Sequence, residues 1–219
     1  MNEYINYSFI GNLFMGRPFN DTEKNNIKNL LIAKGRKLFS IHGLKKTTIE
    51  DITNEIGIAQ GSFYAFFDSK EALYFEILEI EERKLGETLK FSLNSIEINR
   101  KNFKQFLLKS LDQILKNPFI KDIVLSDSYQ NLLRKIPEDR MKRHLEDEAQ
   151  LLMETIHVFQ EQGVMKKADP YILTGLFHGL FILYLHKKDI GTDIFDQVID
   201  LLLDLISDSL IDTGDRNLR

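Results

Sequence analysis

Residues 43–73 of this chain read GLKKTTIEDITNEIGIAQGSFYAFFDSKEAL and contain the local signals for two short helices and the start of a third. Thr47 and Thr48 are each followed three residues later by an acidic residue, which is the pattern of a capping box at a helix N-terminus. Gly57 ends the first short helix, and a second is expected over about 59–66. Two short helices joined by a tight glycine-containing turn are typical of a helix-turn-helix.

A longer helix is expected directly before this stretch, over about residues 23–42. Ile27, Leu31 and Leu38 recur along one side of it, and Gly43 stands where glycine commonly ends a helix. This helix supplies the support that the two short helices of a helix-turn-helix require.

Helical spacing also dominates the rest of the chain, which holds only four prolines and no useful run of alternating apolar residues. Asp68 is expected to cap a long helix that reaches to about residue 94. Five further helices are expected over about 100–116, 119–134, 138–162, 168–187 and 193–212. The fold class is therefore predicted to be all-α.

The charge of the chain is distributed unevenly. Residues 24–70 carry eight Lys or Arg and four Asp or Glu, whereas the whole chain of 219 residues has a net charge of −4. A basic segment on an otherwise acidic chain suits a polyanionic partner that binds at one end only. The excess is small, so a chance distribution of surface charge stays an alternative.

Composition and motif content exclude several classes of protein. The absence of cysteine excludes disulfides and thiolate metal sites and is compatible with a cytoplasmic location. The N-terminus lacks the features of a signal peptide, and the most apolar stretch, Tyr171 to Leu185, is too short to span a membrane. We therefore expect a cytoplasmic protein with no membrane partner.

The sequence contains none of the common catalytic fingerprints. It has no Gly-x-Ser-x-Gly elbow, no phosphate-binding loop and no dinucleotide motif. No metal-binding spacing relates its five histidines, which are His42, His144, His157, His178 and His186. We therefore expect no enzymatic activity, no catalytic residue, no cofactor and no metal.

The residues around the second short helix divide into an inner and an outer set. Apolar side chains that can hold the helix in place are Ile58, Phe63, Phe66 and Phe67. Small or hydrogen-bonding residues that suit a base-reading surface are Gln60, Gly61 and Ser62. Candidate phosphate ligands are Thr47, Thr48, Tyr64 and Lys70. The alternative is that these polar residues only cap and pack the helices.

The spaced signals G…TT-x-x-D-I, G-x-x-x-G-x-x-Y-x-x-F and S-K-E-x-L in residues 43–73 resemble the N-terminal domain of the tetracycline-repressor (TetR) family, over about residues 25–75. The resemblance implies a homodimeric, all-helical regulator that binds palindromic operators and releases DNA when a ligand enters its C-terminal domain. It also implies base contacts from the glutamine, glycine and serine of the outer set and phosphate contacts from the four candidate phosphate ligands.

The resemblance divides the chain into three parts. Residues 1–22 are an N-terminal arm, residues 23–70 with the first turn of the next helix to about 75 are the DNA-binding domain, and residues 71–219 are a regulatory and dimerisation domain. The predicted function is that of a ligand-responsive repressor. The alternative is an architectural or protein-controlled DNA-binding protein with no small effector.

The N-terminal arm admits two interpretations. Arg17 beside Pro18 could enter a minor groove, as N-terminal arms do in other proteins. Alternatively, the arm could pack against its own or a partner subunit through its aromatic residues, which are Tyr4, Tyr7, Phe9, Phe14 and Phe19.

The last two long helices are expected to form a dimer interface. Small residues four apart let another helix approach closely, and the last helix carries a wide apolar stripe. The predicted interface residues are Gly175, Gly179, Val198 and Leu202. Both helices could instead belong only to the core of one subunit.

The aromatic supply of the C-terminal half suits a pocket for an apolar or planar effector. The candidate lining residues are Phe103, Phe106, Phe119, Tyr129, His157, Phe177 and His178. The chain has 16 phenylalanines, so core packing is the alternative for each aromatic member of this set.

We predict a modest salt dependence for operator binding. Related recognition helices often carry a basic or polar residue after the tyrosine, whereas here Ala65 and Phe66 follow Tyr64. Fewer phosphate contacts then release fewer counterions. The slope of log affinity against log salt concentration measures this number, and a slope that implies about ten or more released counterions would contradict the prediction.

Overall fold

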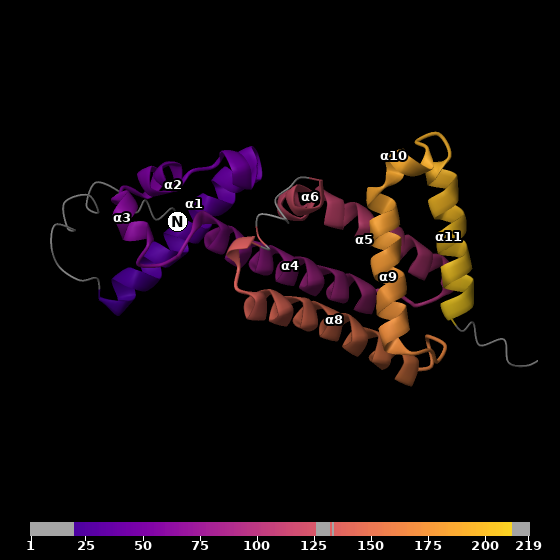
Figure 1. The fold of residues 1–219 in the computed structure, drawn as a ribbon. Helices are drawn as coiled ribbons and strands as arrows, with labels where there is room; N and C mark the ends of the chain where they lie inside the picture. Colours follow the sequence, from indigo (N-terminus) through magenta and orange to yellow (C-terminus); the bar gives the residue numbers. More distant parts are fainter. Residues whose placement is uncertain (1–19, 126–131, 133, 212–219) are drawn as a thin grey trace, which may run out of the picture. The chain divides into compact units, whose positions relative to one another are not determined.

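The computed structural model describes residues 20–125, 132 and 134–211. Within these residues every named element is a helix, and the isolated antiparallel bridge between Met165 and Ile211 is the one β-type pairing (Figure 1). This confirms the predicted all-α fold. None of the helices in the described part is long and apolar enough to cross a membrane. Residues 1–19 of the N-terminal arm lie outside the described residues, so both interpretations of the arm stay predictions.

The chain forms two compact units, one comprising Met1–Glu82 with Pro118–Glu138 and the other comprising Arg83–Asn117 with Asp139–Arg219. The predicted division gave residues 23–70, with the first turn of the next helix to about 75, to the DNA-binding domain. The first half of the fourth helix and a later segment both group with the N-terminal unit, because their contacts are with its helices. No local signal in the sequence indicates that residues 118–138 pack with the N-terminal helices, because the partners are far apart along the chain.

Five helices contribute described residues to the N-terminal unit. They are α1 (Asp21–Lys46), α2 (Ile49–Ile56), α3 (Gln60–Phe63), the start of α4 (Lys70–Asn94) and α6 (Pro118–Leu125). Helix α3 is shorter than the predicted span of 59–66. The helix predicted over 119–134 begins as expected, but residues 126–131 and 133 lie outside the described residues.

Helix α1 is closed at both ends by local interactions. The Asn20 side chain accepts a hydrogen bond from the Glu23 N–H (2.8 Å), and the Glu23 carboxylate accepts one from the Asn20 N–H (2.9 Å). Gly43 interrupts the helix with φ 73° and ψ 171°, a conformation that favours glycine. A last turn then continues to Lys46, so the predicted break occurs but is not the final residue of the element.

Helix α4 packs closely on α1. A Cβ atom at Gly35 would lie only 2.9 Å from Leu73 Cδ2, so the absence of a side chain permits the two helices to approach. The Arg36 guanidinium donates two hydrogen bonds to the buried Glu81 carboxylate, at 2.7 and 3.1 Å. This paired geometry fixes the register between the two helices.

The cap of α4 differs from the prediction. The Ser69 hydroxyl accepts a hydrogen bond from the Ala72 N–H (3.1 Å), so Ser69 caps the helix and the prediction for Asp68 is wrong. Serine and aspartate are both good caps, and their adjacency in the sequence left the choice to the backbone conformation.

The second unit surrounds a single apolar core. Its helices are the second half of α4, α5 (Arg100–Lys116), α8 (Glu138–Glu161), α9 (Pro170–Leu185), α10 (Lys187–Ile190) and α11 (Phe195–Leu210). Helices α9 and α11 run side by side in Figure 1. Buried residues that join these helices include Phe103, Leu107, Leu111, Ile156, Leu180, Ile199 and Leu203.

Charges flank this core where α5 meets α11. The Lys104 ammonium lies 2.7 Å from a carboxylate oxygen of Asp200 and 2.7 Å from one of Asp204. Hydrogen bonds to Asp200 and then to Asp204 raise the pKa of Lys104 above its ordinary value. Arg100 lies 3.4 Å from Asp208, one turn farther along α11. These three acidic side chains of α11 thus turn toward α5, and another exposed side of α11 carries apolar residues.

The link between the end of α1 and the start of α4 gives a first test of the fold. The Lys70 ammonium donates to the backbone oxygens of Leu44 (2.8 Å), Thr47 (2.8 Å) and Lys45 (3.4 Å). Lys70→Met leaves these oxygens without their charged donor, so we expect the free energy of unfolding to fall by about 1.5–3 kcal/mol. Urea denaturation measures this change.

Lys101→Met serves as the control, because Lys101 is an exposed lysine of α5. Its effect should stay within about 0.5 kcal/mol. Equal stability of the two variants would contradict the role assigned to Lys70.

Candidate nucleic-acid interface

Helix α2 begins with a complete capping box at Thr48. The Thr48 hydroxyl oxygen accepts a hydrogen bond from the Asp51 N–H (3.1 Å), and the Asp51 carboxylate accepts hydrogen bonds from the Thr48 N–H (2.9 Å) and hydroxyl (2.6 Å). The hydrogen bonds that Thr48 donates hold the pKa of Asp51 below its ordinary value, and the bond from the Thr48 side chain has the larger effect. Of the two registers that the sequence allowed, the structure uses the one that starts at Thr48.

The turn between α2 and α3 is made by Gly57. Its φ of 72° and ψ of 32° lie in the left-handed region, where a side chain would be strained. The Gly57 N–H donates to the Asn54 oxygen (3.3 Å), and the Ile58 N–H donates to the Thr53 oxygen (3.1 Å). These bonds satisfy the end of α2 and direct the chain straight into α3.

Aromatic residues anchor α3 from its inner side, as the sequence predicts. Phe63 is fully buried and Phe67 is buried, with their ring centroids 5.8 Å apart. Ile58 and Phe66 are half-buried. On α2, Ile52 and Ile56 complete the apolar layer between the two helices. The buried side chains on the inner side of α3 therefore hold the helix in place, with its outer side free of packing contacts from these residues.

The outer side of α3 presents the residues predicted to read bases. Gln60 and Gly61 are exposed and Ser62 is half-buried. No atom lies within 4 Å of the position that a Cβ atom of Gly61 would take. Tyr64 follows at the C-terminal end of the helix with 55% of its surface exposed. The structure thus brings these four residues together around one short, exposed helix.

Two of the four predicted phosphate ligands have other partners. Thr47 is 1% exposed, and its hydroxyl donates to the Gly43 oxygen (2.9 Å). The Lys70 ammonium is held by the carbonyl oxygens at the end of α1. Both side chains therefore have a structural role as donors to the backbone, and phosphate binding by either stays a prediction. Sequence spacing could not reveal a lysine that reaches back over 20 residues.

The remaining two predicted phosphate ligands differ in availability. Thr48 is exposed, but its hydroxyl hydrogen is directed at Asp51. The Tyr64 ring packs edge-on against Phe63, with centroids 5.7 Å apart, while much of the side chain remains exposed. Tyr64 is thus the more available donor of the pair.

A contact from α6 stabilises the base of this unit and was not anticipated from the sequence. The fully buried Tyr74 hydroxyl donates to the Asp122 carboxylate (3.0 Å), and the Leu44 N–H lies 3.4 Å from the same oxygen. Burial, reinforced by the negative charge of Asp122, raises the pKa of Tyr74. The partners are separated by 48 and 78 residues, so no local pattern signals them.

The described residues among those predicted to line one effector pocket lie in several different places. Phe103 and Phe177 pack edge-on in the core of the second unit, whereas Phe119 is buried beside Tyr74 in the N-terminal unit. His178 is exposed on α9. Tyr129 lies outside the described residues. Aromatic content alone could not distinguish core positions from lining positions.

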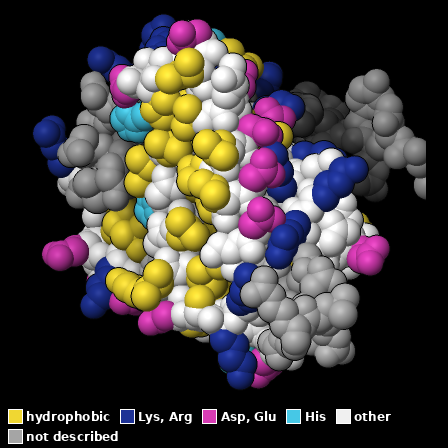
Figure 2. Space-filling view, turned by 90° about the vertical axis from the view of Figure 1, so that its right-hand side faces the viewer, with side chains coloured by type: hydrophobic (Ala, Val, Ile, Leu, Met, Phe, Trp, Pro, Cys, Tyr) yellow, Lys and Arg dark blue, Asp and Glu magenta, His cyan; other side chains and the backbone are white. Residues whose placement is uncertain are grey.

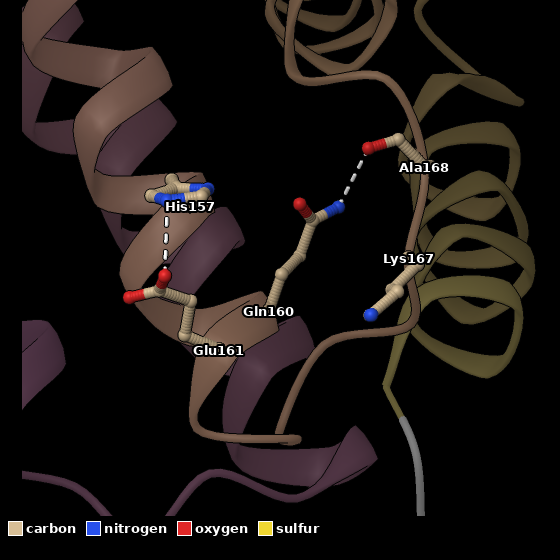
Figure 3. Close-up of a pocket in the computed structure, with 5 residues that line it drawn as sticks. All are labelled: His157, Gln160, Glu161, Lys167 and Ala168. Atoms are coloured by element: carbon tan, nitrogen blue, oxygen red, sulfur yellow. Dashed lines mark hydrogen bonds and ion pairs between the residues drawn. The ribbon is translucent and has the colours of Figure 1, made fainter.

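The other two predicted lining residues border separate hollows. His157 borders an open hollow of about 780 Å³ between the end of α8 and the segment before α9 (Figure 3). There His157 pairs with Glu161 (3.1 Å), and the Gln160 amide donates to the Ala168 oxygen (2.7 Å). Phe106 borders a different groove, between α4 and α5.

The predicted dimer residues lie on the expected helices but only partly at the surface. Gly175 and Gly179 are exposed, and apart from their own turn of helix no described atom lies within 4 Å of either Cβ position. Val198 is half-buried, and Leu202 is half-buried against the core. The most exposed leucine on α11 is Leu201, with Leu205 next to it on the same side. The apolar pattern of α11 was too uniform to show which of its sides faces the core.

Comparison with known proteins identifies the N-terminal unit. The model of bacterial regulatory proteins of the tetR family matches residues 31–77. The HTH-type transcriptional repressor KstR2 of Rhodococcus jostii is 42% identical over 62 residues, which cover 28% of this chain and 30% of KstR2. For three curated relatives, the matched part spans 30–55% of the relative's own length.

Solved structures share the fold over most of the chain. A TetR-family transcriptional regulator from Pectobacterium atrosepticum superposes with a TM-score of 0.68 at 22% identity, covering 89% of this chain and 99% of that one. RolR in complex with resorcinol has a TM-score of 0.56 at 18% identity, covering 85% of this chain and 90% of RolR. Through residues 31–77, which contain the helix-turn-helix, the chain is similar to the tetR family of bacterial regulatory proteins.

Proposed function

We propose that this chain is a homodimeric transcriptional repressor that binds a palindromic DNA operator and releases it when a small effector binds the second unit. The observation that carries the proposal is the outer side of α3, where Gln60, Gly61 and Tyr64 are exposed above the buried Phe63 and Phe67. A short helix with an anchored inner side and a polar outer side is the form that enters a major groove.

Each residue of this surface has a physical role in the proposed complex. The Gln60 amide offers a donor and an acceptor, which match the N7 and N6 edge of adenine. Gly61 lets the backbone approach the groove because no side chain intervenes, and Ser62 adds a hydroxyl. The Tyr64 phenol donates to a phosphate and thereby positions the helix.

Repression, as opposed to activation, is supported by the similarity of the N-terminal unit to the repressor KstR2. A protein seated on a promoter blocks polymerase without any further activity, so DNA binding that an effector reverses is sufficient for the proposed role. The same chain expressed beside a reporter gene under its own promoter tests the sign of regulation.

Substitutions on α3 test the DNA-binding surface. Gln60→Ala removes a base contact worth about 1–3 kcal/mol, so we expect operator affinity to fall by roughly 5- to 150-fold. Tyr64→Phe removes a single hydrogen bond and should weaken binding about fivefold. Fluorescence anisotropy with a duplex from the chain's own promoter region measures both affinities.

The control is Lys101→Met on α5, which should bind DNA as the unmodified chain does. Melting temperatures of all variants should agree, because Gln60 and Tyr64 are exposed. Unchanged affinity in both α3 variants would refute this surface. Equal, strongly salt-dependent binding to an unrelated duplex would instead favour an architectural DNA-binding protein.

The proposed dimer uses an apolar band on α9 and α11. Figure 2 shows hydrophobic side chains gathered down this face, with acidic side chains along one edge. Tyr171 is 76% exposed and Leu201 is 61% exposed, while Gly175 and Gly179 leave room for a second helix. A contiguous exposed apolar band marks an interaction surface. A second copy is the proposed occupant, because a palindrome needs two recognition helices about 34 Å apart.

Charge substitutions within the band test the dimer. The double variant Leu201→Glu, Leu205→Glu places two like charges in each half of a two-fold interface, so we expect a monomer by light scattering where the unmodified chain is a dimer. Phe91→Glu is the control, since Phe91 is an apolar residue on α4 that is even more exposed than Leu201 and Leu205. A double variant that stays dimeric would exclude this band as the interface.

Control by a small effector is supported by the structural likeness to RolR, which was solved with resorcinol. The second unit also carries an apolar core and hollows of its own, apart from the helix-turn-helix. Release of operator DNA from the purified chain on addition of a compound is the measurement that defines an effector.

A further inference from the structure

The flank of α5 beside the core borders a groove of about 330 Å³. Phe103 and Leu107 occupy the core side of the helix, which leaves Phe106 half-buried at the groove. The opposite wall is the end of α4, represented by Leu89, and Ile96 just beyond it. Both walls belong to the second unit.

The base of the groove is apolar in character although two serines line it. The Ser92 hydroxyl donates to the Thr88 oxygen (2.8 Å), and the Ser110 hydroxyl donates to the Phe106 oxygen (2.8 Å). Each hydroxyl hydrogen is thereby committed to its own helix. A hydrocarbon chain laid on Phe106 would not displace either bond.

The α5 rim of the groove is a row of hydrogen-bond donors. Gln105, Lys109 and Gln113 are spaced four residues apart and therefore share one ridge of the helix. All three are exposed, and within the described residues their side chains have no hydrogen bond or ion pair. Lys104, in contrast, is held between two aspartates of α11.

The single acid that borders the groove lies at the end opposite to the lysine. Glu97 precedes α5, and its backbone oxygen accepts a hydrogen bond from the Asn102 amide (2.9 Å), which places it near Asn102. Seven residues of helix separate Asn102 from Lys109, a distance of about 10 Å. The groove thus has one cationic end, an apolar middle and one anionic end.

From this arrangement we infer that the groove binds a monoanionic amphiphile, namely a carboxylate with an apolar chain about 10 Å long. The carboxylate pairs with Lys109 between the two glutamine amides, and the chain lies along Phe106 and Leu89. A second carboxylate at the far end would meet Glu97 and be repelled. The inference rests on the proposed function, because it names the chemical class of the effector.

Sodium octanoate is the probe, and binding is measured by calorimetry on the full chain without DNA. Octanoate should bind once per chain and raise the melting temperature. Octan-1-ol lacks the charge and suberate carries a second one, so both should bind at least about tenfold more weakly. Affinity should rise two- to fourfold for each added methylene from hexanoate to octanoate.

Variants separate the groove from general detergent binding. Lys109→Met should weaken octanoate about tenfold, whereas Lys101→Met, on the same helix but outside the groove, should not. Phe106→Ala should reduce the gain per methylene. Equal binding of octanoate to the Lys109 variant, or equal binding of octanoate and octan-1-ol, would overturn the inference.

The DNA measurement is kept separate so that the two proposals can fail independently. Octanoate binding that depends on Lys109, in a chain that binds no operator, would uphold the groove and refute the regulator. Operator binding by a chain that does not bind octanoate would uphold the regulator and overturn the groove.

Discussion

The ammonium group of Lys70 lies among the backbone oxygens of Leu44 and Thr47, and this contact closes the segment that contains the helix-turn-helix. The end of a helix leaves carbonyl groups without intrahelical donors, and a cation there is favoured by the helix dipole. Because Lys70 is also the first residue of α4, one side chain joins the end of α1 to the start of α4. Helices α2 and α3 lie between these two points, so their position depends on it.

The remaining interactions of the N-terminal unit hold α1, α4 and α6 firmly together. Gly35 lets α1 and α4 approach, and the Arg36–Glu81 pair sets their register. Tyr74 and Asp122 then bind α6 to the same base. A binding surface made of a four-residue helix has almost no stability of its own, so its precision comes from what lies beneath it. The exposed residues of α3 are therefore not required to stabilise the fold and are free to contact DNA in the proposed complex.

The second unit shows how one helix can serve several purposes. Helix α5 turns Phe103 toward the core and Phe106 toward the groove, and its lysines divide in the same way between Lys104, paired with α11, and Lys109, unpaired in the described part of the chain. Helix α11 likewise presents acids to α5 and leucines to solvent. With 3.6 residues per turn, a shift of one position moves a side chain to a different environment.

The sequence by itself determined the all-α fold, the helix-turn-helix, a capping box at Thr47 or Thr48 and the outward set Gln60, Gly61 and Tyr64. These features depend on residues a few positions apart, whose preferences act within a single turn of the chain. Only the tertiary structure gave Thr47 and Lys70 their backbone partners, and it alone separated the six described aromatic and histidine candidates into core, surface and groove. It also placed α6 in the N-terminal unit. Apart from the bond of Thr47 to Gly43, those outcomes depend on contacts across 20 to nearly 80 residues, which burial and chain topology select and which no local spacing records.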